Sequence, residues 1–477
     1  MSGLKNRSKM PSKEPPTFKP TLILHGGAGP IFRSTLPPDL YAKYHASLLS
    51  YLRSSKHLLD NGARALDAAV HAVSLMEDDE LFNCGRGSVF TSTGTIEMEA
   101  SVMVTSVMGE DKITQSSKTM KRGAGVMGIK NVRHPIRLAR EVLNRTGQDE
   151  NGEPVGGEEG LDGSMHSQLM GPYVEGLARE WGLEFKPDGW FWTEKRWREH
   201  LGGLKESRGL MMSGEDEDNL GDGYPSQGTV GCVCLDQWGG LAVATSTGGL
   251  TNKFPGRVGD TPTLGAGFWA ETWEAEADGP VLEREAMHQH ERMRYLPQTG
   301  TASVPHREKS LWDMTSAECF SGLFKDEDET ESIACPVSAQ SFTDVKPKVF
   351  PTQKRRAVAV SGTGNGDAFL RTAAARTTCA MMRFSEKPVS LAEAVTAVAG
   401  ADGELQRSAG RRFGKTLEGE GGIIGIEVEI DDNPPPVSSL RRGKVAFDFN
   451  CGGMFRAWVE DRSGRDVAQV MVFKEPY

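Results

Sequence analysis

The chain has 477 residues, enough for two or three average domains or for one large α/β unit with insertions. Its 65 acidic and 55 basic residues give a formal net charge of −10, which argues against a protein that binds nucleic acid through charge. No apolar run approaches the roughly 18 residues of a membrane span, so we expect neither a nucleic-acid nor a membrane partner. Glycine makes up about 12% of the chain, where roughly 7% is usual, which indicates many turns and backbone-lined sites.

The N-terminal segment and the cysteines indicate where the protein is found. Residues 1–20 are basic, rich in proline and without an apolar stretch, so we expect a disordered tail rather than a secretory signal. The seven cysteines are odd in number and scattered, and no CxxC pair is present. This pattern predicts neither a disulfide framework nor a metal site. A reducing compartment, most simply the cytoplasm, is therefore expected.

The first half of the chain contains several predicted strands and helices. Residues 21–25 (TLILH) predict a strand, and they are followed by a Gly-Gly-Ala-Gly turn. The further elements predicted here are helices at 38–61, 63–76, 135–144, 167–181 and 193–204, and strands near 88–91, 95–104 and 123–130. Residues 145–165 have no periodicity and are expected to be a loop insertion. Residues 205–228 carry an acidic run and are expected to be a flexible linker.

The second half begins where the linker ends. TVGCVCLD and GGLAVATST predict a tight hairpin of two buried strands, and GAGFWA predicts another strand. Residues 271–355 are charged and rich in proline, which indicates a long insertion. The elements predicted after it are a strand, turn and helix from 355 to 382, a helix at 390–400, and closing strands at 422–430 and 443–449. Because strands cluster near the ends of both halves with helices between them, the pattern favours a layered α+β fold.

Gly228 and Thr229 lie where the acidic linker ends and a buried strand begins. A threonine inside a chain is a poor nucleophile, but as a new N-terminus its own α-amine can accept the hydroxyl proton. That amine has an ordinary pKa of about 7.7–8.0, close to working pH. A glycine before the threonine leaves room for the hydroxyl to attack the preceding carbonyl. On local sequence alone, however, a turn entering a β-branched strand is the simpler interpretation.

The loop after the hairpin carries residues suited to binding an amino acid. Thr247 ends the second strand, where it can approach the start of the partner strand. Arg257 and Asp260 follow on a loop rich in glycine and proline. An arginine fork recognises a carboxylate through two parallel hydrogen bonds, and an aspartate recognises an ammonium group. Together they can grip the α-carboxylate and α-amine of an amino acid, although an ordinary surface salt bridge is the alternative.

A second glycine-rich turn, SGTGNGD at 361–367, separates a predicted strand from a helix. Its backbone N–H groups and a threonine hydroxyl suit an oxyanion hole or a carboxylate. No Lys-Ser/Thr pair follows as in a phosphate-binding loop, and GxGxxG is not matched. The sequence therefore gives little support for a nucleotide cofactor.

The string GTVGCVCLDQWGGLAVATSTGGLTNKFPGRVGDTPTLGAG resembles the catalytic region of plant-type L-asparaginases, also called isoaspartyl aminopeptidases. These are N-terminal-nucleophile (Ntn) hydrolases. HGGAG (25–29) and stretches at 82–103, 128–139, 361–371 and 449–458 support the resemblance in family order. It implies an αββα four-layer sandwich with two insertions. It also implies one domain made of an α-subunit part, 21–228, and a β-subunit part, 229–477, and a heterotetramer of two cleaved αβ units.

The resemblance assigns roles to particular residues. Those with catalytic roles are the nucleophile Thr229, freed by cleavage after Gly228, then Thr247, which hydrogen-bonds the nucleophile, and the oxyanion-hole residues Thr363 and Gly364. Those near the substrate are Arg257 for its carboxylate, Asp260 for its amine, Gly366 on the oxyanion loop, and Asn83. HGGAG matches a segment that helps processing in relatives.

The function implied is hydrolysis of the side-chain amide of L-asparagine, of β-aspartyl (isoaspartyl) peptides, or of both. Thr229 carries the chemistry by itself, so no cofactor is expected. Two alternatives remain open. The chain can be a threonine protease that cuts proteins, similar to threonine aspartases, or an unprocessed and inactive relative that only binds its ligands.

Overall fold

The computed structural model describes residues 17–108, 121–147, 166–207, 228–275, 354–430 and 440–477. Within them, two main β-sheets and their packed helices account for most of the structure, and the mixed α/β class predicted from the sequence is confirmed. Across this described part, no helix is long and apolar enough to cross a membrane.

The larger sheet has eight strands in the order β14-β13-β2-β6-β7-β3-β4-β5. In chain order these are β2 (Thr21–Gly29), β3 (Met98–Ser106), β4 (Arg122–Ile129), β5 (Gln168–Met170), β6 (Val230–Leu235), β7 (Gly240–Thr247), β13 (Gly453–Arg462) and β14 (Arg465–Met471). The predicted tight hairpin is confirmed as β6 and β7. Strand β2 pairs with β6 in antiparallel register, Thr21 opposite Leu235. A strand from before residue 228 is therefore bonded to the strand that begins just after it.

The smaller sheet has four strands in the order β12-β10-β9-β8. Its members are β8 (Phe268–Ala275), β9 (Lys354–Gly364), β10 (Gly421–Ile430) and β12 (Lys444–Phe449). The two sheets pack against each other through one apolar cluster. Ile23 and Val233 enter it from the larger sheet, and Phe268, Ala359 and Ile424 enter it from the smaller one.

Strands β2, β6 and β7 of the larger sheet are buried on both faces, which explains why they read as nearly continuous apolar runs. Because side chains alternate along a strand, Leu22 and Leu24 face the helices while Ile23 faces the other sheet. In β6, Cys232 faces the helices and Val233 faces the other sheet in the same way. This alternation decides which polar residues point between the sheets.

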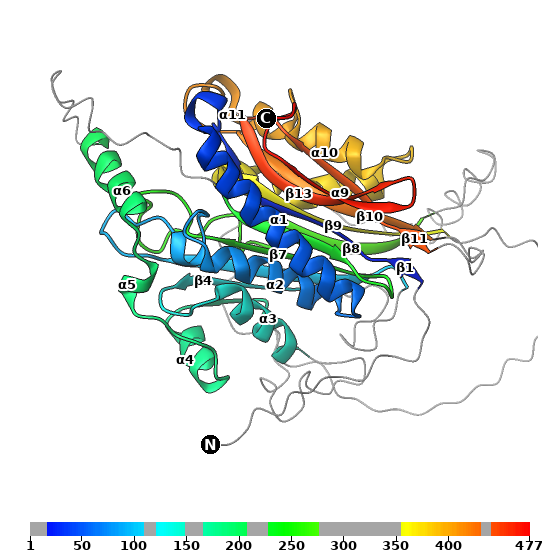
Figure 1. Cartoon of the computed structure of the whole chain (residues 1–477), viewed down its shortest axis with the longest axis horizontal. Coiled ribbons are helices and arrows are strands. Elements are labelled where there is room, and N and C mark those ends of the chain that lie inside the picture. Colours follow the sequence, from blue (N-terminus) through cyan, green and yellow to red (C-terminus); the bar gives the residue numbers. More distant parts are fainter. Residues whose placement is uncertain (1–16, 109–120, 148–165, 208–227, 276–353, 431–439) are drawn as a thin grey trace, which may run out of the picture. The chain divides into compact units, whose positions relative to one another are not determined.

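Helices cover the outer face of each sheet (Figure 1). The larger sheet is covered by α1 (Pro38–Asp60), α2 (Ala65–Asp78) and α3 (Pro135–Arg145). The smaller sheet is covered by α8 (Gly366–Thr372), α9 (Ala374–Phe384), α10 (Leu391–Ala399) and α11 (Glu404–Ala409). The other α-helices among the described residues are α4 (Tyr173–Glu180), α5 (Asp188–Phe191) and α6 (Glu194–Ser207). Each sheet therefore has an apolar helical cover of its own.

Several predicted boundaries were wrong in stretches that are rich in charged residues and glycine. The predicted insertion 271–355 begins too early, because β8 continues to Ala275 with Glu271 buried, and ends too late, because β9 starts at Lys354. The acidic linker also begins later than predicted, since α6 extends to Ser207. Arg376 and Arg383 pair with the buried Glu271, so this charged residue fits inside the strand. The remaining parts of these segments lie outside the described residues.

Other short elements were misassigned for lack of a local signal. The predicted helix at 167–181 is a short strand, β5, followed by α4, and the predicted strand at 88–91 is reduced to a single bridge between Thr91 and Lys253. The chain also closes with β13 and β14, which the sequence reading did not predict. Both strands are stabilised by pairing within the sheet, which a local pattern does not reveal.

The predicted disordered tail at 1–20 is also too long at its end, because Phe18 is fully buried and pairs in register with Arg441. These residues form β1 (Phe18–Lys19) and β11 (Arg441–Arg442). Residues 1–16 lie outside the described part.

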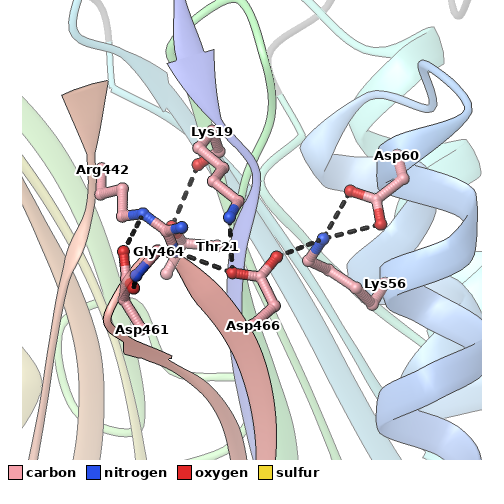
Figure 2. Close-up of polar contacts among 8 residues, drawn as sticks. All are labelled: Lys19, Thr21, Lys56, Asp60, Arg442, Asp461, Gly464 and Asp466. Carbon is pink, nitrogen blue, oxygen red and sulfur yellow. Dashed lines mark hydrogen bonds and ion pairs between the residues drawn. The ribbon is translucent and has the colours of Figure 1, made fainter. Parts of the chain in front are cut away.

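An ionic cluster joins β1 and α1 to the C-terminal strands (Figure 2). Asp466 of β14 lies 2.7 Å from Lys19, 3.2 Å from Lys56 and 2.9 Å from Arg442. Partial burial opposes ionisation of Asp466, but hydrogen bonds from Lys19, Arg442 and Lys56 outweigh it and hold its pKa at about 2. The cluster therefore adds a charged contact between the segments before and after Gly228.

Candidate active site

Polar side chains of five strands meet in the space between the two sheets. Val233 of β6 faces this space, and Thr229 lies on the same side of the chain at the start of the strand. The inward positions of β2, β3, β7 and β9 change in the same way from apolar to polar residues. The polar side chains at these inward positions, all buried, are His25, Glu99, Ser101, Thr229, Thr245, Thr247, Ser361 and Thr363. We call these eight residues the polar layer.

Gly228, the residue before Thr229, lies directly against Thr363 and Gly364. A β-carbon built on Gly228 would be 2.6 Å from Thr363 Oγ1 and 2.9 Å from the Gly364 amide nitrogen. The Ala28 amide donates a hydrogen bond of 3.2 Å to Thr363 Oγ1, so the HGGAG segment orients this hydroxyl. Gly364 has φ +142° and packs against the backbone of β10, which leaves no room for a side chain. Four predicted site residues are therefore brought together.

His25 supports the backbone of this region in its neutral form. Its Nε2 atom lies 2.7 Å from Ser361 Oγ. Burial lowers the pKa of His25 to about 3, and a hydrogen bond with the Thr229 backbone only partly opposes this shift. The ring is therefore uncharged at neutral pH. It holds the start of β6 against β9 without adding a charge.

The Thr229 hydroxyl has a partner that the sequence reading did not identify. Thr229 Oγ1 lies 2.9 Å from Thr261 Oγ1, and both side chains are buried. Thr261 directly follows Asp260 in the sequence, which is the only signal that could have marked it. It connects the predicted nucleophile to the loop that carries the predicted substrate-binding residues.

Arg257 and Asp260, which we call the Arg–Asp pair, converge on Gly366 at the start of α8. A β-carbon on Gly366 would lie 2.5 Å from Asp260 Oδ1 and 3.1 Å from Arg257 Nη2. Arg257 also forms an ion pair of 2.8 Å with the exposed Asp367. The absence of a side chain at Gly366 thus lets the guanidinium and the carboxylate approach the same point. Three more predicted residues are brought together.

Asp260 is buried in a site that contains several charges. Its Oδ2 atom has no hydrogen-bond partner among the described residues. Burial raises the pKa of Asp260 to about 7; Arg257 opposes this shift, while Glu99 and Asp367 reinforce it. A buried carboxylate with a free oxygen and neighbouring acids is suited to receiving an ammonium group.

Glu99 is a second buried acid that the sequence reading missed. It lies opposite Thr247 in the β3–β7 register, and its Oε1 accepts a hydrogen bond of 2.9 Å from the Gly259 amide. Burial raises its pKa, with Lys253 the strongest opposing charge. A charged residue at an inward position of an otherwise apolar strand was the available signal. This hydrogen bond connects Glu99 to the loop that carries the Arg–Asp pair.

Asn83 and Thr247 lie together at the turn after β7. Asn83 Nδ2 donates to the Gly249 carbonyl at 2.8 Å, and the backbone carbonyl of Asn83 accepts from the Gly248 amide at 2.9 Å. Thr247 Oγ1 accepts from the Gly249 amide at 3.0 Å. Thr247 belongs to the polar layer and follows Ser246, which pairs with Val230. The structure therefore places both residues near the start of β6.

Within the described residues, no group of three or more histidine, cysteine, aspartate or glutamate side chains is arranged to hold a metal ion. The expectation of a site without metal or cofactor stays a prediction.

Comparison with known proteins places this arrangement in a family. The sequence model of the family described as asparaginase matches residues 18–149 and 154–277. The chain belongs to this asparaginase/isoaspartyl peptidase family. The matched residues of this family member include Gly228, Thr229 and the Arg–Asp pair.

Individual relatives extend the comparison. The isoaspartyl peptidase of Salmonella typhimurium is 28% identical over 92% of this chain and 95% of its own length. The isoaspartyl peptidase of Escherichia coli is 35% identical over 53% of this chain and 68% of its own length. An isoaspartyl peptidase/L-asparaginase of Xenopus laevis is 34% identical over 53% of this chain and 67% of its own length.

Proposed function

We propose that this family member is an autocleaving hydrolase of the side-chain amide of L-asparagine, of isoaspartyl peptides, or of both. One observation carries the proposal: the half-buried Gly228, which precedes the buried Thr229, lies against Thr363 and Gly364. The Arg–Asp pair lies close by, joined to Thr229 through Thr261. The names of the relatives, isoaspartyl peptidase and L-asparaginase, support the substrate class.

The first reaction is cleavage of the chain itself. Thr229 Oγ1 attacks the carbonyl carbon of Gly228, the C–N bond between the two residues breaks, and the hydroxyl proton ends on the Thr229 nitrogen. Water then hydrolyses the resulting ester. The products are a C-terminal carboxylate on Gly228 and a free α-amine on Thr229.

In turnover, the free amine of Thr229 accepts the proton of its own hydroxyl, and the oxygen attacks the amide carbon of the substrate side chain. We assign the oxyanion to the Thr363 hydroxyl and the Gly364 N–H, donors of a kind that typically contribute about 3 kcal/mol each. Thr247 is assigned a hydrogen bond to the nucleophile in the cleaved enzyme; in the uncleaved chain the Thr229 hydroxyl bonds to Thr261 and Thr247 Oγ1 accepts from Gly249. Ammonia or an amino acid leaves, and water cleaves the β-aspartyl ester to release aspartate without a cofactor.

The Arg–Asp pair is proposed to bind the backbone groups of the substrate. The guanidinium group of Arg257 can form two parallel hydrogen bonds with the α-carboxylate of the substrate. When substrate enters, this carboxylate replaces Asp367 as the ion-pair partner of Arg257 or shares the guanidinium with it. Asp260 offers its unpartnered oxygen to the α-ammonium. Gly366 leaves the space between them open, and Asn83 holds the turn beside Thr247.

We further propose the αββα Ntn sandwich for the fold, with two sheets between two helical layers. Residues 21–228 and 229–477 would be its α- and β-subunit parts, and two such units would form a heterotetramer. The scattered cysteines favour a cytoplasmic location. The mass of the processed protein in solution tests the assembly.

A single preparation tests the proposed function. Wild-type protein should run as two fragments, with Thr-Val-Gly-Cys at the new N-terminus, while Thr229→Ala should stay intact and inactive. Release of ammonia from L-asparagine and of aspartate from β-aspartyl dipeptides measures turnover. An intact wild-type chain with no activity would identify an inactive binding relative. Cleavage of proteins without hydrolysis of either small substrate would identify a threonine protease.

A further inference from the structure

Among the described residues, Thr261 is the one side chain that forms a hydrogen bond with the Thr229 hydroxyl. The two Oγ1 atoms lie 2.9 Å apart. Thr261 is completely buried, and Thr229 is 5% exposed, so water competes little for this contact. Any movement of the Thr261 side chain therefore changes the direction in which the Thr229 hydroxyl points.

The backbone of Thr261 is fixed on both sides. Ser101 Oγ donates to the Thr261 carbonyl at 2.5 Å, and Thr245 Oγ1 lies 2.5 Å from Ser101 Oγ. Thr261 lies in a turn closed by a hydrogen bond of 3.0 Å from the Thr263 amide to the Asp260 carbonyl. Pro262 follows, which disfavours helical backbone at Thr261, and Gln168 Nε2 donates to the Pro262 carbonyl at 2.6 Å. Threonine also has a stiff χ1 angle. The hydroxyl of Thr261 is thus held by a rigid support made of three strands.

The residues that hold Thr261 lie on the same face of the larger sheet as Thr229. Ser101 and Thr245 are members of the polar layer, at inward positions of β3 and β7. Among the described residues, neither side chain hydrogen-bonds to Thr229, and both bond to the Thr261 carbonyl. Asp260, the residue before Thr261, belongs to the Arg–Asp pair. One short segment therefore carries both a substrate-binding group and the partner of the nucleophile.

We propose that Thr261 is a further catalytic residue of this enzyme, whose hydroxyl donates a hydrogen bond to Thr229 Oγ1 and aims this oxygen at the carbon it attacks. With Thr261 as the donor, the Thr229 hydroxyl proton stays free to pass to the Thr229 nitrogen, and a lone pair of Thr229 Oγ1 attacks the Gly228 carbonyl carbon. The bonds made and broken are those of the cleavage reaction described above, and Thr261 is unchanged at its end. The inference rests on the proposed function, because it names a helper of the same nucleophile.

Substitution of Thr261 by valine keeps the shape of the side chain and removes the hydroxyl, whereas serine keeps the hydroxyl. We expect Thr261→Val to slow autocleavage by about tenfold or more, and Thr261→Ser to retain most of the rate. In whatever fraction is processed, kcat should fall with little change in KM, because the Arg–Asp pair is untouched. Cleavage is followed on gels over time, and kcat and KM are measured with L-asparagine.

Thr378→Val is the matched control. Thr378 is a buried threonine of α9 whose hydroxyl, among the described residues, bonds only to the Ala374 carbonyl of its own helix. Its loss therefore removes a buried hydroxyl away from the polar layer. Thermal unfolding of every variant checks folding. If Thr261→Val does not fold, Thr261→Ser and Thr261→Ala are compared, and the inference then requires serine alone to cleave at a near-normal rate.

The outcomes separate this inference from the proposed function. A wild-type chain that neither cleaves nor hydrolyses asparagine overturns the proposed function. A wild-type chain that does both, with Thr261→Val cleaving as fast or faster, overturns the role of Thr261 alone. Slow cleavage by both valine and serine variants assigns Thr261 a packing role and also overturns it.

Discussion

Gly228 occupies the space beside Thr363, so close that a β-carbon on Gly228 would lie 2.6 Å from the Thr363 hydroxyl oxygen. The residue before the proposed cleavage bond therefore covers the two groups assigned to the oxyanion, Thr363 and Gly364. In the uncleaved chain the bond to be cut and the later substrate use the same place. Cleavage must precede substrate binding there.

Gly228→Ala should slow autocleavage strongly, because its methyl group would collide with Thr363 and Gly364 and shift the carbonyl away from Thr229. Contacts below 3.0 Å to backbone and to a buried hydroxyl cannot be relieved without moving β9 or the start of β6. Gels over time measure the rate. Gly176→Ala is the control, since no atom lies within 4 Å of a β-carbon at that helical glycine. Equal rates for Gly228→Ala and wild type would contradict the tight contact.

Arg257→Ala should weaken the binding of small substrates and leave autocleavage largely intact. Loss of hydrogen bonds to a charged group typically costs about 1.5–3 kcal/mol, which raises KM by roughly 10- to 100-fold. Arg257→Lys should recover only part of the loss, because lysine lacks the planar fork. Thr247→Ala should instead lower kcat. Steady-state kinetics with L-asparagine check both, and small, equal effects of the two alanine variants would count against the assigned roles.

Substrate binding should weaken as the pH falls through about 7, where Asp260 gains its proton. The sign follows from the chemistry, because burial raises this pKa and only the ionised carboxylate attracts the α-ammonium. Measured kcat/KM for L-asparagine should therefore show an acidic limb near this pH.

Glu99→Gln should move that acidic limb to lower pH. The change removes a neighbouring negative charge that raises the pKa of Asp260, while the amide oxygen can still accept the hydrogen bond from Gly259. Glu427→Gln, far from the site on β10, serves as the control for loss of a buried acid. A limb that stays in place in the Glu99 variant would show that this charge does not reach Asp260.

Deletion of residues 276–353 should leave folding and autocleavage possible. Ala275 and Lys354 face each other in the β8–β9 register, so a short Gly/Ser turn can join the two strands. The segment connects the stretch that contains Asp260 to the strand that ends near Thr363, so we expect the deletion to change selectivity. Rates on L-asparagine, β-aspartyl dipeptides and longer isoaspartyl peptides measure it. Parallel changes in all three would exclude a specificity role, and an unfolded product would show that the segment is required for folding.

Local sequence patterns were sufficient to predict a helix or strand where one short segment contains the whole pattern. The helix at Pro38–Asp60 and the β6–β7 hairpin follow from apolar spacing and a Gly turn. The boundaries around Glu271 and the strands after Phe449 were wrong, because a buried charge with partners on another helix and a strand bonded to a distant edge leave no local pattern.

The same division holds for the site. Thr229, Arg257 and Asp260 stand out as contiguous motifs, so the sequence by itself determined the family and the candidate residues. Only the tertiary structure decided that Gly228 contacts Thr363 and that Thr261 hydrogen-bonds the Thr229 hydroxyl. It also decided that Glu99 binds the amide of Gly259, on the loop of the Arg–Asp pair. These contacts join β3, β6, β9 and a loop, which are remote from one another in the chain. They form because side chains alternate along each strand, so that the polar residues of several strands point into one buried space between the two sheets.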